Sequence, residues 1–77
     1  MLVSNDANKR LIMFSNWGDA SAMDKSFWPK IVGTLGVDEA AVVMAAYYPT
    51  GSGIAGVQIC TKDDVIGWVN AQNLRKI

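Results

Sequence analysis

The chain has 77 residues, enough for one small domain, and 51% of them are hydrophobic, which excludes a disordered chain. Seven basic and seven acidic residues cancel, so no bulk positive charge is present to attract nucleic acid or an anionic membrane. A single cysteine, Cys60, excludes an internal disulfide and a cysteine-based zinc site, and it favours a reducing compartment.

The first residues show no basic segment followed by an apolar run, so we expect no signal peptide. The longest apolar run, Ala40 to Tyr48, is too short to span a bilayer. We therefore expect a cytoplasmic protein with a single domain over residues 1–77, in which the polar residues 1–10 form a partly flexible arm.

The first half of the chain predicts two short strands separated by a loop. Leu11–Phe14 has the length of a buried strand, and Ile31–Leu35 lies between turn-forming residues. Residues 15–21 are rich in turn formers, and residues 24–28 can form one helical turn.

Residues 37–48 are ambiguous between strand and helix. Their alanines and Met44 favour a helix, whereas the valine and tyrosine pairs favour a strand. No polar face contrasts with the apolar one, although a helix on a small domain should show such a face. We therefore favour a strand and keep a small α+β fold, with a helix at 37–48, as the alternative.

The second half predicts a hairpin. Residues 49–53 form a clear loop, and residues 57–61 alternate between two faces, as a half-buried strand does. A turn at 62–64 connects them to a strand at 65–69, and residues 70–73 can form a 3-10 turn. About five strands result, which predicts an all-β fold with a small barrel.

Within the last long strand, Gly67 can adopt a bulged geometry that bends the chain. Trp68 and Val69 point to opposite faces, so one of them should be buried and the other should lie at the surface.

These segments, taken in order, resemble those of bacterial SH3 domains. The residues that carry the resemblance are Leu11–Phe14, Ile31–Leu35, Ala41–Met44, Val57-Gln58-Ile59, Gly67-Trp68-Val69 and Asn73-Leu74. The loop from Asn16 to Lys30 lacks the Arg-x-Gly-Pro element that often follows the first strand of that family. The resemblance implies a small SH3-like barrel that binds a protein or peptide in a groove between its first long loop and a later hairpin.

Aromatic side chains are the best candidates for a binding site. The candidates are Trp17, Trp28, Tyr47, Tyr48 and Trp68. Flat rings stack on prolines and a tyrosine hydroxyl can bind a backbone carbonyl, so these side chains suit an extended or polyproline peptide. The alternative is that they fill the core or cover one end of the barrel.

Catalytic motifs are lacking in the sequence. There is no histidine to act as a base or to activate Cys60, and Gly51-Ser52-Gly53 lacks the lysine that follows in a phosphate-binding loop. Asp63 and Asp64 read as a solvated turn. We therefore expect no enzyme activity, no cofactor and no metal.

Two alternatives remain open. The first is a structural subunit in which the alanine-rich face Ala40–Ala46 builds a homo-oligomer, consistent with the zero net charge. The second is an enzyme, because Val57-Gln58-Ile59 resembles part of the Val-Gln-Ile-Tyr core of type II dihydrofolate reductases, with Cys60 in place of the tyrosine.

Overall fold

The computed structural model describes residues 1–17, 29–48 and 55–77. The strands are β1 (Leu2–Asn5), β2 (Leu11–Phe14), β3 (Ile31–Leu35), β4 (Ala40–Tyr47), β5 (Gly56–Thr61), β6 (Ile66–Asn70) and β7 (Leu74–Lys76), with a 3-10 turn at Ala71–Asn73. The all-β prediction is confirmed, and the alternative helix at 37–48 is excluded because β4 occupies that segment. In the described ranges no helix is long and apolar enough to cross a membrane.

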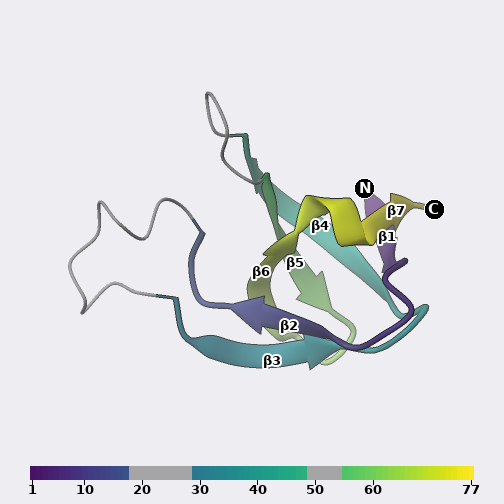
Figure 1. Cartoon of the computed structure of the whole chain (residues 1–77), viewed down its shortest axis with the longest axis horizontal. Coiled ribbons are helices and arrows are strands. Elements are labelled where there is room, and N and C mark those ends of the chain that lie inside the picture. Colours follow the sequence, from purple (N-terminus) through teal and green to yellow (C-terminus); the bar gives the residue numbers. More distant parts are fainter. Residues whose placement is uncertain (18–28, 49–54) are drawn as a thin grey trace.

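The strands form one antiparallel sheet in the order β3-β2-β6-β5-β4-β1-β7 (Figure 1). The predicted hairpin is β5–β6, whose register runs from Gly56↔Asn70 to Cys60↔Ile66. At its turn, Thr61 accepts hydrogen bonds on Oγ1 from the backbone of Asp63 and Val65. The predicted 3-10 turn is also confirmed, since the Asn70 side chain caps it by accepting from the backbone N–H of Gln72.

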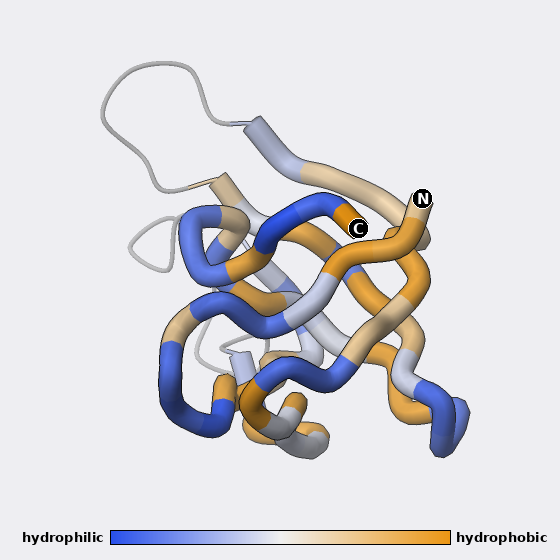
Figure 2. The backbone as a smooth tube through the Cα atoms, turned by 90° about the vertical axis from the view of Figure 1, so that its right-hand side faces the viewer, coloured by the Kyte–Doolittle hydropathy of each residue, from blue (hydrophilic) through white to orange (hydrophobic). Residues whose placement is uncertain are grey.

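The sheet curls around its core. Asn5 in β1 and Leu35 in β3 are five strand steps apart, which is about 24 Å in a flat sheet. Yet Asn5 Nδ2 lies 3.0 Å from the carbonyl oxygen of Leu35, so β1, the neighbour of the edge strand β7, comes against the opposite edge strand β3. Along the curled chain, apolar stretches follow most of the strands, whereas the stretch leading to the C-terminus, which includes β7, is hydrophilic (Figure 2).

Every strand except β7 contributes to one buried core. The core side chains are Val3, Leu11, Met13, Leu35, Ala41, Val57, Ile59 and Val69. The alternation predicted for residues 57–61 is confirmed, because Val57, Ile59 and Thr61 are buried. Val69 is buried while its neighbour Trp68 is only half-buried, as expected for side chains on opposite faces.

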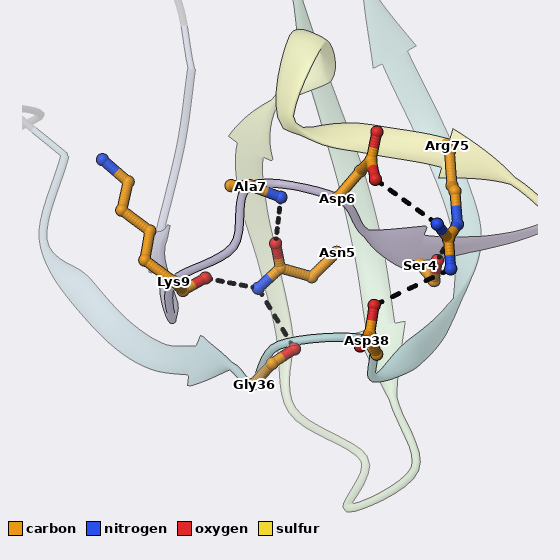
Figure 3. Close-up of polar contacts among 8 residues, drawn as sticks. All are labelled: Ser4, Asn5, Asp6, Ala7, Lys9, Gly36, Asp38 and Arg75. Carbon is orange, nitrogen blue, oxygen red and sulfur yellow. Dashed lines mark hydrogen bonds and ion pairs between the residues drawn. The ribbon is translucent and has the colours of Figure 1, made fainter.

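Residues 2–5, within the expected N-terminal arm, form strand β1, in which Asn5 is fully buried. Its amide nitrogen donates to the carbonyl oxygens of Lys9, at 2.7 Å, and Gly36, at 3.1 Å, and its Oδ1 accepts from the backbone of Ala7 at 2.8 Å (Figure 3). Hydrogen bonds thus satisfy a buried polar side chain. Hydropathy alone reads such a residue as exposed, which is why this strand was not predicted.

The last strand, β7, pairs with β1 and was also not predicted. Arg75 of β7 donates to the hydroxyl of Ser4 at 3.1 Å and forms ion pairs with Asp6, at 3.4 Å, and Asp38, at 3.7 Å (Figure 3). These contacts hold two short, partly polar strands, β1 and β7, in the sheet. The described ranges therefore contain seven strands, whereas the sequence predicts about five.

The bulge expected at Gly67 is not found in its pairing with β5, which has no register shift. Shifts occur instead where Val32 and Met44 are inserted, in the β2–β3 and β4–β5 pairs. Gly67 serves close packing, because a Cβ there would lie 2.8 Å from Cγ2 of Val32 and 2.9 Å from Cβ of Met13.

Candidate functional site

The indole of Trp17 lies against Gly56, the first residue of β5. A Cβ at Gly56 would overlap the ring at Cγ, Cδ1 and Cδ2, so only glycine admits the ring this closely. The ring of Phe14 also contacts this indole, with its centroid 6.2 Å from that of Trp17 and the two planes tilted by 58°. The distance lies within the ordinary range for favourable aromatic pairs, so Phe14 contributes to the packing of Trp17.

The strand register places Tyr47 beside Gly56, on the same face of the sheet. Gly56 is directly opposite Tyr47 of β4 and Asn70 of β6, and directly opposite residues share one face of a sheet. That face is the outer one, because the alternate residues of β5, Val57 and Ile59, belong to the core.

Trp68 lies on the same outer face, next along the strands. It is opposite Gln58 of β5 and Phe14 of β2. Phe14, Trp17, Tyr47 and Trp68 therefore gather on one surface, which we call the aromatic site.

The exposure of these side chains separates them from the core. Phe14, Trp17 and Trp68 are half-buried, and Tyr47 keeps 40% of its surface exposed. Tyr48, the residue after β4, is 74% exposed. None of the described aromatic residues is a core residue, which argues against the alternative that they fill the barrel. The fifth candidate, Trp28, lies outside the described residues.

The sequence interpretation missed three parts of this surface. Phe14 was assigned to a buried strand. Because Leu11 and Met13 point into the core, however, the alternation along β2 places Phe14 on the outer face. Gly56 and Gln58 were not considered, yet the period of two in β5 puts both on the outer face. The contact between Trp17 and Gly56 had no signal in the sequence, because it joins a loop to a distant strand.

Other reactive groups stand apart from the aromatic site. Cys60 is half-buried, with Sγ 3.6 Å from the carbonyl oxygen of Thr61. Asp63 and Asp64 are exposed on the β5–β6 turn, where Asp64 has a φ of 63°. Within the described ranges no three His, Cys, Asp or Glu side chains gather as metal ligands.

The aromatic site therefore offers stacking surfaces and the hydroxyl group of Tyr47. No family model, no curated protein and no solved structure matches the chain.

Proposed function

We propose that the chain is a non-catalytic binding module of the bacterial SH3 type, which holds an extended, proline-containing segment of a partner protein on the aromatic site. The observation that carries this proposal is the contact of Trp17 with Gly56, beside Tyr47. It fixes a partly exposed indole next to an exposed phenol on the outside of the sheet.

This arrangement suits a polyproline-type ligand for two physical reasons. Rings that are already held by packing lose little conformational freedom when a ligand stacks on them. A polyproline segment is itself stiff and leaves its carbonyl oxygens free, so the Tyr47 hydroxyl can donate to them.

The order of the strands supports the SH3 comparison. The segments Leu11–Phe14 and Ile31–Leu35 are strands β2 and β3, and Gly67-Trp68-Val69 lies within β6. The 3-10 turn at Ala71–Asn73 lies between β6 and Leu74, in the order of segments that suggested the comparison. A net charge of zero fits a protein ligand rather than nucleic acid. The free thiol of Cys60 fits a reducing cytoplasm.

The test is a titration followed by nuclear magnetic resonance. Isotope-labelled protein is mixed with a peptide of about ten prolines, long enough for about three turns of polyproline helix, and separately with a Gly/Ser peptide of equal length. We expect the indole N–H of Trp17 and the amide of Tyr47 to shift with oligoproline and not with the Gly/Ser peptide.

Two variants decide whether the aromatic site is responsible. Replacing both Tyr47 and Tyr48 by alanine should remove the shifts while the spectrum stays folded. The matched control is Ile77→Ala, which removes a similarly exposed apolar side chain at the end of the chain, beyond β7. Absence of shifts with oligoproline, or shifts that persist in the double tyrosine variant, would overturn the proposal.

A further inference from the structure

A second apolar surface crosses the outer face of the sheet at the other end of its strands. Leu2 of β1 is opposite Val42 of β4, Val42 is opposite Cys60 of β5, and Cys60 is opposite Ile66 of β6. Opposite residues share a face, so these four side chains form one continuous line, which we call the apolar row.

The apolar row is exposed although all its members are apolar. Leu2, Val42 and Ile66 keep 49%, 45% and 48% of their surface exposed, and Cys60 is half-buried between them. Scattered apolar residues are normal on a protein surface, but a contiguous set marks an interaction site.

An open groove of about 500 Å³ lies along this row. Its walls include Leu2, Val42, Met44 and Cys60, and its rim carries Lys62 and Asp64. Met44 is the residue inserted at the β4–β5 register shift, and 55% of its surface is exposed. The bulge therefore raises a flexible apolar side chain beside the groove, where it can adapt to an apposed surface.

The charges at the rim of the groove are complementary to those of a second copy of the chain. Lys62 and Asp64 sit on the same β5–β6 turn, and within the described ranges neither has an ion-pair partner in its own chain. A two-fold axis along the strands brings the turns of two copies to the same end of their contact. Lys62 of each copy can then lie beside Asp64 of the other, so the surface is complementary to itself.

We infer that the apolar row, with Met44 and the Lys62–Asp64 turn, is the interface of a homodimer in which two sheets pack face to face. The zero net charge of the chain adds no long-range repulsion between copies. Tyr47 lies five positions beyond Val42 on β4, about 15 Å along the strand, so the dimer leaves both aromatic sites open. The inference does not rest on peptide binding.

The experiment is analytical ultracentrifugation of the whole chain from about 5 μM to about 1 mM, the range in which small interfaces associate. We expect the wild type to pass from monomer to dimer across this range. Val42→Lys should raise the dimer dissociation constant at least about tenfold, because it inserts an unpaired charge into the contact. A wild type that stays monomeric at the highest concentration would overturn the inference.

The matched control is Val37→Lys. Val37 is exposed to 43%, close to the 45% of Val42, but it lies in the turn between β3 and β4, outside the apolar row. The Val37→Lys variant should dimerise like the wild type. Loss of the dimer in this variant, or retention of the dimer in Val42→Lys, contradicts the proposed interface. If Val42→Lys does not fold, Lys62→Glu provides the same test from the exposed rim, since it puts two like charges beside each other across the interface.

Discussion

The side-chain amide of Asn5 donates a 3.0 Å hydrogen bond to the carbonyl oxygen of Leu35, across 30 positions of the sequence. The same amide group reaches the carbonyl oxygens of Lys9 and Gly36, while its Oδ1 accepts from the backbone of Ala7. A single buried side chain thus joins β1, the turn after it and the end of β3. The sheet closes at this point through hydrogen bonds, not through apolar contact alone.

Replacing Asn5 by alanine should lower the free energy of unfolding by about 2–3 kcal/mol, because several buried backbone groups would lose their partners. Asn5→Asp should be at least as harmful, since a carboxylate keeps the acceptor for Ala7 but cannot donate to the three carbonyl oxygens. Urea unfolding followed by circular dichroism measures both effects. Variants within about 0.5 kcal/mol of the wild type, the range of ordinary surface substitutions, would show that Asn5 does not hold the sheet closed.

Gly56→Ala should displace the indole of Trp17 from β5 while the sheet remains folded. The added methyl group would occupy the position of the ring. We expect a large shift of the Trp17 indole N–H resonance, greater quenching of tryptophan fluorescence by acrylamide, and loss of the oligoproline response. Gly36→Ala is the control, because its new Cβ meets only the movable ends of Glu39 and Arg10. An unchanged Trp17 resonance in Gly56→Ala would disprove the contact.

Gly67→Ala should destabilise the domain by about 1–3 kcal/mol through overpacking. Its Cβ would lie 2.8 Å from Cγ2 of Val32 and 2.9 Å from Cβ of Met13. Thermal unfolding of the single variant and of the double variant with Val32→Ala separates the two contacts. The double variant should recover part of the loss, since only the Val32 clash is relieved, and a single variant as stable as the wild type would argue against tight packing at this position.

Asn8 adopts a φ of 59°, in the left-handed region that asparagine and glycine tolerate better than other residues. Asn8→Ala should therefore cost about 1 kcal/mol, whereas Asn8→Gly should be close to neutral. The midpoint of urea unfolding is the measurement, with the slope expected to stay constant. Equal stability of the two variants would show that the backbone at this turn relaxes freely.

The strands that could be predicted from the sequence are those whose signals lie in adjacent residues. The period of two in residues 57–61 and the turn at 62–64 identified the β5–β6 hairpin, because alternation and turn chemistry are both written in adjacent residues. The valine and tyrosine pairs of residues 37–48 outweighed the alanines of that segment, which contains β4, for the same reason. In contrast, β1 is held by Asn5, whose hydrogen-bond acceptors are separated from it by up to 31 positions.

The candidate site was predictable in its chemistry and not in its geometry. Tyr47 and Trp68 could be named as aromatic residues near strand ends, and the sheet brings them to one face. The role of Gly56 could not be predicted from the sequence, since a glycine at the start of a strand gives no indication of which ring will cover it. Bulges at Val32 and Met44 were missed because they follow from the curvature of the whole sheet.

The pairing of β1 with both β4 and β7 also sets an order of events during synthesis. Ser4 leaves the ribosome first, and its contact with Arg75 forms only after 71 further positions have been translated. At about 5–20 residues per second, this interval is roughly 4–14 s. During that time one edge of β1 has no native neighbour, so nascent chains on the same messenger are exposed to pairing with one another before each can complete its own sheet.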